Sequence, residues 1–171
     1  MIRKKKLYVR PKKMYEKVRI EEENNLKKKY ALKSKREVWK VDAKVDYYRS
    51  RAKDLAKASM EEQKILFGKL TSLGIKVDSI ADVLALKIEN FLERRLPYIL
   101  FRKGLAKTPQ QARQFVAHKN VLINNNVVNS PSYIVPVAEE NSISLRVKAK
   151  VKKPKAEVAA EPIAVPAEVA K

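Results

Sequence analysis

The residues best placed to do chemistry are basic, and they are concentrated between positions 94 and 119. Arg94 and Arg95 come first, Arg102 and Lys103 follow about two helical turns later, and Arg113 lies in a second amphipathic segment. An arginine fork binds a phosphate through two parallel hydrogen bonds, and a lysine adds a point charge. This set therefore indicates binding of a polyanion and not the making or breaking of a covalent bond.

The chain carries a large positive charge that is unevenly distributed. Its 171 residues include 39 Lys and Arg against 19 Asp and Glu, a formal charge of +20. Residues 1–58 hold 21 basic and 8 acidic side chains, residues 59–150 hold 14 and 8, and residues 151–171 hold 4 and 3. Such a charge repels itself unless an acidic partner neutralises it. We therefore expect a polyanionic partner, and most of the positive charge that attracts it lies in the N-terminal third.

Several other classes of protein are excluded by what the sequence lacks. It has no cysteine and a single histidine, His118, so neither a disulfide nor a metal centre is expected. Its three glycines cannot build a phosphate loop or a dinucleotide fingerprint, and no cofactor or small-molecule substrate is expected. No apolar window approaches the length of a membrane span, and no secretory signal follows Met1. The expected location is the cytoplasm, with no membrane partner.

Two helices must position the basic residues between 94 and 119. The stretch 94–104 is predicted to be one helix, with Pro97 in its first turn and Gly104 as its end. The capping pattern from Thr108 to Gln111 opens a second helix that runs to about His118. The inner faces are predicted to contain Leu96, Ile99, Leu100, Ala112, Phe115 and Val116.

Short strands are predicted after these helices. Val121–Ile123 and Val127–Val128 flank Asn124–Asn126, whose residues tolerate positive φ, so a hairpin is expected. Further strands are predicted over residues 132–135 and, from the alternation of apolar and polar residues, over 143–147. This part of the chain is therefore predicted to combine two helices with a small antiparallel sheet.

Residues 20–92 are predicted to be entirely helical. Ser34, Ser59 and Ser79 each stand where a side-chain oxygen caps a helix, and Gly74 is placed to end one. The helices are predicted over residues 20–30, 35–58, 59–73 and 79–86.

Apolar residues in this region recur at steps of three and four, which predicts one buried stripe on each helix. Trp39 and Tyr48 could stack on nucleic-acid bases, but aromatic residues at this spacing are more often core residues, and packing is the favoured interpretation. The predicted inward positions are Val38, Trp39, Val41, Val45, Tyr48, Ala52, Leu55, Ala56, Ile65, Leu66, Leu70 and Leu73.

The two ends of the chain are predicted to lie outside the folded regions. Residues 1–19 mix basic residues with Tyr8, Pro11 and Tyr15 and lack apolar periodicity, so they form an extended basic arm that either threads into a polyanion or is simply solvated. Residues 151–171 are rich in Ala, Val, Glu, Pro and Lys and are predicted to be disordered. The predicted organisation is an arm over 1–19, a helical domain over 20–92, a module over 93–150 and this tail.

The order and spacing of the basic and polar residues follow a recognisable pattern. It consists of Arg95-Leu96, Phe101 to Leu105, Gln111 to Gln114, His118-Lys119 and Asn129 to Tyr133. With this pattern, residues 94–135 resemble the RNA-binding module of the ribosomal protein S-four family, and residues 19–39 resemble the N-terminal region of that family's archaeal and eukaryotic-type members. The Asn125-Asn126 turn replaces the family's Asn-Gly, and the cysteine zinc knuckle of many bacterial members is missing.

This resemblance implies an α+β fold in which two antiparallel helices pack on a small bent antiparallel sheet, after an all-helical region. It implies a structural protein of the small ribosomal subunit, not an enzyme, that binds the five-prime domain of the small-subunit rRNA at a multi-helix junction and promotes early assembly. Its partners are this rRNA and neighbouring small-subunit proteins. A shared polar face around Arg95, Arg102 and Arg113 is expected to set its register on the RNA.

The expected RNA-binding residues fall into two groups. Any single lysine among them could be merely solvated, and His118 could instead interact with the dipole at the end of its helix. The module supplies Arg94, Arg95, Arg102, Lys103, Lys107, Arg113, Gln114, His118 and Lys119. The helical domain supplies Arg36, Lys40, Lys44, Arg49, Arg51 and Lys53.

Two other functions use the same module. An RNA-modifying enzyme such as a pseudouridine synthase needs a separate catalytic domain with a fixed aspartate, and residues 21–92 offer aspartates only in helical or capping positions. A free RNA-binding factor or chaperone shares the RNA chemistry but not the N-terminal resemblance. The ribosomal hypothesis is therefore preferred.

Overall fold

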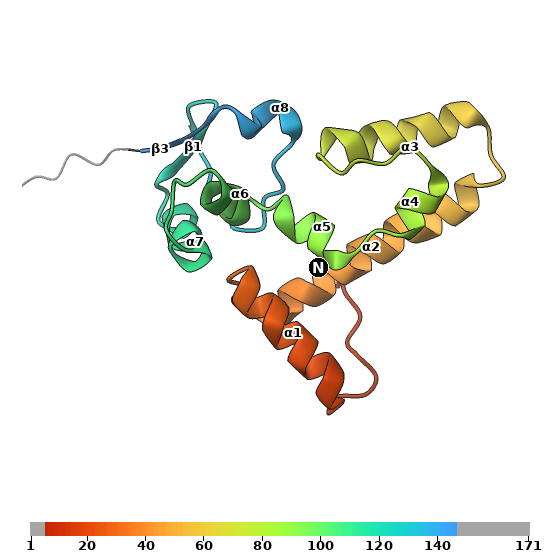
Figure 1. The fold of residues 1–171 in the computed structure, drawn as a ribbon, viewed down its shortest axis with the longest axis horizontal. Helices are drawn as coiled ribbons and strands as arrows, with labels where there is room; N and C mark the ends of the chain where they lie inside the picture. The colour runs from red at the N-terminus through yellow and green to blue at the C-terminus, as the bar shows by residue number, and fades with distance from the viewer. Residues whose placement is uncertain (1–5, 147–171) are drawn as a thin grey trace, which may run out of the picture.

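The computed structural model describes residues 6–146, which form a helical region followed by a small α+β module. Figure 1 shows the long helix α2 and its neighbours on one side, the module on the other, and α5 between them. The predicted fold class is confirmed. The predicted tail, residues 151–171, lies outside the described residues.

The helical region contains five helices within the described chain. Because the apolar stripe of α2 packs against α3, α4 and α5, these elements share one core around Val45, Leu70 and Phe91. A second cluster joins the end of α1 to α2 and α5 through Tyr30, Val38 and Leu92. The helices are α1 (Lys17–Lys29), α2 (Lys35–Leu55), α3 (Met60–Ser72), α4 (Ile80–Leu84) and α5 (Ile88–Glu93).

The module has its own core beneath α6 and α7. Leu96, Leu100 and Val116 are buried against the central strand residue Val121. Strand β1 pairs antiparallel with both neighbours, giving the order β2-β1-β3. Its elements are α6 (Leu96–Arg102), α7 (Pro109–Ala117), β1 (Val121–Ile123), β2 (Asn126–Val127), α8 (Val137–Glu140) and β3 (Ile143–Leu145).

Several local predictions are confirmed. Gly74 and Gly104 end α3 and α6 with φ values of +80° and +73°, in the left-handed region that glycine adopts without strain. Asn124 and Asn125 have φ values of 49° and 63° and form the predicted tight hairpin turn. Ser79 caps α4 in a complete capping box with Asp82.

Other predictions were wrong. Ser34 and Ser59 precede α2 and α3 but make no capping hydrogen bond with their side chains. Ile65 is 59% exposed instead of facing inward. The predicted strand 132–135 is reduced to one bridge between Arg95 and Ile134, because this segment pairs with the residues before α6 and not with the sheet.

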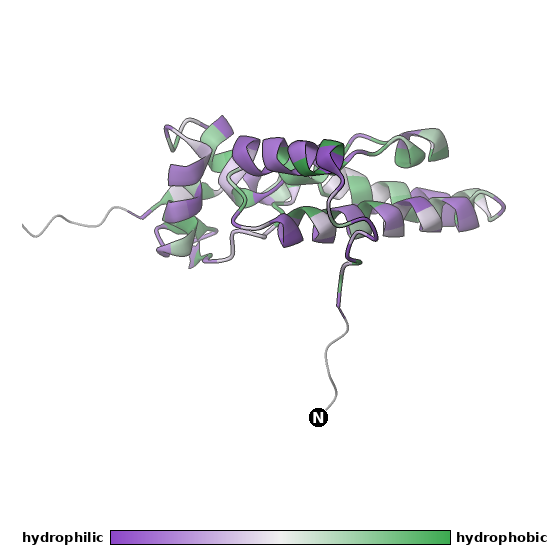
Figure 2. Cartoon of the chain, turned by 90° about the horizontal axis from the view of Figure 1, so that it is seen from below, coloured by the Kyte–Doolittle hydropathy of each residue, from purple (hydrophilic) through white to green (hydrophobic). Residues whose placement is uncertain are grey.

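The surfaces of the helices are strongly polar. Figure 2 shows hydrophilic residues along the exposed sides of the helices and apolar residues where they meet. No helix among residues 6–146 is long and apolar enough to cross a membrane. The basic residues therefore lie on helices whose apolar sides face the cores.

Candidate nucleic-acid interface

Glu37 of α2 is the point at which the helical region and the module are joined by ion pairs. Its Oε2 accepts a hydrogen bond from Nη2 of Arg95 at 2.7 Å, and its Oε1 accepts one from Nη2 of Arg113 at 2.7 Å. Nη1 of Arg113 also donates to the carbonyl of Ala31 at 3.3 Å. We call Glu37, Arg95 and Arg113 the Glu37 cluster. It explains why Glu37 does not complete a capping box with Ser34.

Arg94 is held in a separate buried site on the other side of the same junction. Its Nη1 donates to Oε2 of Glu140 at 2.9 Å, and its Nη2 donates to the carbonyl of Val135 at 2.9 Å. Gly74 packs directly against the guanidinium, since a Cβ at that position would lie 2.6 Å from Cζ of Arg94. Arg94 thus ties α8 to the end of α3.

The predicted polar face shared by Arg95, Arg102 and Arg113 is not present. Arg95 is only 5% exposed, and both it and Arg113 are turned toward Glu37. Arg102 is exposed and lines a different hollow, together with Gly68 of α3 and Val137 of α8. Sequence spacing predicted that the three side chains lie on one side of their helices. In the structure the Glu37 carboxylate of α2 binds Arg95 and Arg113, and Arg102 lies apart from them.

The remaining predicted residues of the module lie on its surface. Lys103 donates to the carbonyl of Glu140, whereas no partner is recorded within residues 6–146 for the side chains of Lys107 and Lys119. Lys119 has a φ of +59°, just after the C-terminal end of α7. The exposed members of the predicted set are Arg102, Lys103, Lys107, Gln114, His118 and Lys119.

The predicted residues of α2 differ in how freely they face solvent. Arg49 donates to the carbonyl of Leu86 at 2.7 Å and so helps to fix α5. Nζ of Lys44 lies 5.7 Å from the ring centre of Phe91, and burial lowers the pKa of this lysine. The exposed members of this group are Arg36, Lys40, Arg51 and Lys53.

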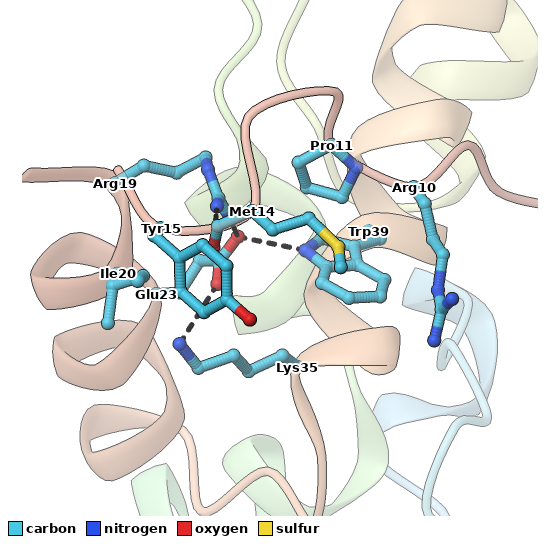
Figure 3. Close-up of a pocket in the computed structure, with 9 residues that line it drawn as sticks. All are labelled: Arg10, Pro11, Met14, Tyr15, Arg19, Ile20, Glu23, Lys35 and Trp39. Carbon is cyan, nitrogen blue, oxygen red and sulfur yellow. Dashed lines mark hydrogen bonds and ion pairs between the residues drawn. The ribbon is translucent and has the colours of Figure 1, made fainter. Parts of the chain in front are cut away.

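Glu23 of α1 anchors the basic arm to the helical region (Figure 3). Its Oε1 accepts hydrogen bonds from Nη1 of Arg19 at 2.6 Å and from Nε1 of Trp39 at 2.8 Å. Its Oε2 lies 3.3 Å from Nζ of Lys35. Nη2 of Arg19 also donates to the carbonyls of Lys13 and Met14. Residues 6–16 of the arm are therefore irregular but tied down on α1 and α2, whereas residues 17–19, which were predicted to belong to the arm, begin α1.

Sequence reasoning missed the two acidic residues that organise these sites. Glu37 was assigned to a cap, and Glu23 was not singled out among its acidic neighbours. One feature of the sequence could have identified Glu37: it is an acidic residue next to the inward-facing Val38 in a very basic helical segment. Buried charges are normally paired, so a carboxylate in that position predicts basic partners, although it does not say which ones.

Known proteins resemble both the module and the helical region of this chain. The S4 domain model matches residues 94–141. A protein of Methanococcus aeolicus named small ribosomal subunit protein uS4 is 44% identical over 133 residues, covering 74% of this chain and 75% of that protein. The chain belongs to the uS4 family. Resemblance to the archaeal branch is confirmed, and the uS4 relatives are ribosomal structural proteins and not enzymes.

Two further uS4 relatives extend the match. The Methanococcus maripaludis protein is 40% identical over 132 residues, covering 73% of this chain and 74% of its own length. The Methanocella arvoryzae protein is 38% identical over 164 residues, covering 88% of this chain and 80% of its own length. The similarity therefore includes the helical region as well as the module, which gives the chain a ribosomal structural role and argues against an RNA-modifying enzyme with an appended module.

The carboxylates of Glu37, which is partly buried, and Glu23, which is buried, predict how stability depends on pH. Burial alone would raise the pKa of Glu37, but hydrogen bonds from Arg113 and Arg95 outweigh it and hold the pKa below the ordinary 4.5. The pKa of Glu23 is likewise lowered, because bonds from Trp39, Arg19 and Lys35 outweigh burial. Their contribution to stability is therefore complete above about pH 4.5 and is lost as the pH falls through the lower folded-state values.

Urea unfolding followed by circular dichroism between about pH 6 and about pH 2 measures this dependence. We expect the midpoint to fall steeply below about pH 4.5 in the natural protein and less steeply in Glu37→Gln, which has lost one of the titrating groups. A variant whose acid-induced loss of stability equals that of the natural protein would show that Glu37 contributes nothing to it.

Proposed function

We propose that this uS4 protein binds the five-prime domain of the small-subunit rRNA at a multi-helix junction and promotes early assembly of the subunit. The observation that carries the proposal is that some basic residues are paired inside the protein while others are exposed on its surface. Three arginines of the module are used inside the protein, whereas the lysines and Arg102 on the module surface face solvent. Exposed cations on rigid helices can displace counterions from RNA phosphates.

Within this proposal the two groups of arginine and lysine have different roles. Arg95 and Arg113 act as positioning residues that hold the module against the helical region through Glu37, and Arg94 fixes α8 within the module and packs against Gly74. Arg102, Lys103, Lys107, Gln114, His118 and Lys119 contact the RNA from the module. Arg36, Lys40, Arg51 and Lys53 contact it from α2, while Lys44 lies over Phe91 of α5 and Arg49 is bonded to the carbonyl of Leu86, just before α5. Backbone and shape, more than base edges, dominate such recognition of folded RNA.

The division of the chain is part of the same proposal. An arm over 1–19, a helical domain over 20–92 and a module over 93–150 would give the RNA three surfaces, with residues 151–171 as a tail. Separate cores in the helical region and the module support the boundary near residue 93. Neighbouring small-subunit proteins are the proposed further partners.

Charge reversal on the module tests RNA contact directly. The double variant Arg102→Glu with Lys107→Glu removes two exposed cations without touching either core. Because each lost phosphate contact lowers the salt slope by about 1, we expect the slope of log affinity against log salt to become shallower by about 2. Filter binding to a transcript of the five-prime-domain junction, over a series of salt concentrations, measures it.

The matched control is Lys64→Glu with Lys69→Glu, which makes nearly the same charge change on exposed positions of α3. We expect the control to change the slope less, because α3 is not among the proposed contacts. Equal effects in the two variants would show that binding depends on net charge alone and that the module surface has no special role.

Sedimentation separates the ribosomal role from that of a free RNA-binding factor. The protein is expected to travel with small subunits in a sucrose gradient at moderate salt. Recovery mainly in the free fractions would contradict the ribosomal assignment, even if the filter-binding result were positive. The two measurements together therefore distinguish RNA binding from stable incorporation into the subunit.

A further inference from the structure

A small apolar hollow lies where the basic arm folds over α1 and α2 (Figure 3). It has a volume of about 270 Å³. Its apolar wall comes from Pro11, Met14 and Tyr15 of the arm, Ile20 of α1 and Trp39 of α2. Large apolar side chains stand at its edge without cover, since Tyr15 is 90% exposed and Met14 is 61% exposed. Exposed apolar groups gathered around a hollow mark a binding surface.

The charges around the hollow are unequal. Arg10, Arg19 and Lys35 line it together with a single carboxylate, Glu23. That carboxylate is only 5% exposed, and it is already bonded to Arg19 and Trp39 and ion-paired with Lys35 at 3.3 Å. Among residues 6–146, no hydrogen bond or ion pair is recorded for the guanidinium of Arg10. An incoming ligand therefore meets positive charge at the rim.

The indole of Trp39 is held in a fixed orientation. Its Nε1 is used by Glu23, and Tyr8 packs against the ring with the ring centres 5.9 Å apart. Arg19 holds the arm in place by donating to the carbonyls of Lys13 and Met14 at 2.7 and 3.1 Å. The hollow is thus formed before any ligand arrives, so little ordering would be needed on binding.

We infer that this hollow binds an unstacked base of the rRNA, with Tyr15 and Trp39 as its aromatic walls and with Arg10 facing the adjoining phosphates. Aromatic side chains stack on bases of any sequence, and single-stranded loops and bulges supply bases free to do so. A hydrophobic side chain of a neighbouring protein would fit the apolar wall but would give the Arg10 guanidinium no anion. The inference rests on the proposed RNA-binding function and adds a specific site to it.

Trp39 is the only tryptophan of the chain, so its fluorescence reports on this hollow alone. Adding a transcript of the five-prime domain is expected to quench the emission and to do so with the same dissociation constant as filter binding. Tyr15→Ala is expected to weaken binding about fivefold or more, the loss that corresponds to about 1 kcal/mol for one stacked base. Because Tyr15 is almost fully exposed, this variant leaves the core intact, which its urea midpoint checks.

Tyr47→Ala is the matched control, since Tyr47 is 57% exposed and does not line the hollow. It is expected to bind the transcript like the natural protein. If the natural protein binds the transcript while Trp39 emission stays constant and Tyr15→Ala binds equally well, the inference is overturned and the proposed function stands. Emission that responds to purified small-subunit proteins and not to RNA also overturns it. Failure of the natural protein to bind the transcript contradicts the proposed function itself.

Discussion

Replacing Glu37 with alanine is expected to lower the free energy of unfolding by about 3 kcal/mol, because it leaves two arginines without their shared anion. Arg95 is nearly buried, and Ser132 Oγ at 3.1 Å is then its main remaining partner. When one member of a buried ion pair is removed, the other charge stays desolvated without a partner. This loss of stability is larger than the loss caused by replacing both members with apolar residues. Urea unfolding at neutral pH measures the loss.

The matched control for this prediction is Glu89→Ala. Glu89 lies 2.9 Å from Lys29, but the two side chains are 43% and 52% exposed. Solvent screens such a pair, so the control is expected to change stability much less than Glu37→Ala does. If Glu37→Ala cost no more than Glu89→Ala, the Glu37 cluster would contribute nothing to the junction between the helical region and the module.

The same variant has a second expected consequence for RNA binding. The Glu37 cluster positions the module, and its loss should weaken binding even though Glu37 itself carries the wrong charge to contact a phosphate. An acidic residue that only repelled RNA would give the opposite result, since its removal would strengthen binding. Filter binding of Glu37→Ala, at a temperature where it remains folded, therefore separates positioning from simple electrostatics.

Replacing Gly74 with alanine is expected to destabilise the protein by about 3 kcal/mol, for two combined reasons. A side chain at a φ of +80° costs about 1 to 2 kcal/mol. The new Cβ would also lie 2.6 Å from Cζ and 2.7 Å from Nε of Arg94. Arg94 cannot move away freely, because it is bonded to Glu140 and to the carbonyl of Val135.

The other two glycines are internal controls for Gly74. Gly104 has a similar φ of +73° but no atom within 4 Å of a new Cβ, so Gly104→Ala should cost only about 1 kcal/mol. Gly68 lies inside α3 in open space, and Gly68→Ala should stabilise by about 1 kcal/mol through helix propensity. Equal losses for Gly74→Ala and Gly104→Ala would show that the site of Arg94 accommodates the methyl group without cost.

Local features of this fold were predictable from the sequence because a few neighbouring residues decide them. Asn124 and Asn125 tolerate the positive φ that a tight hairpin requires, and the hairpin is where the pattern predicted it. Gly74 and Gly104 end their helices, and Ser79 caps the helix that follows it. The apolar periodicity likewise identified Val45, Leu70 and Leu100 as core residues.

The hydrogen-bond and ion-pair partners of polar residues were less predictable, because these partners come from distant elements. Arg95 and Arg113 lie on a polar side of their helices, which is compatible with binding RNA or with binding a carboxylate of the same chain. Glu37 is separated from them by more than fifty positions, and only folding brings it within hydrogen-bonding distance. Ile65 matched the apolar spacing of α3, yet no element covers it and it remains exposed.

The sequence by itself therefore determined the basic character of this uS4 protein, its helices and hairpin, and the kind of partner that its charge requires. Only the tertiary structure decided which arginines are paired inside the protein and which cations stay exposed. The physical reason is that periodicity and turn chemistry act over a few residues, whereas an ion pair depends on which element the fold brings opposite. Trp39 shows the same limit, since its packing partners Tyr8 and Glu23 come from the arm and from α1.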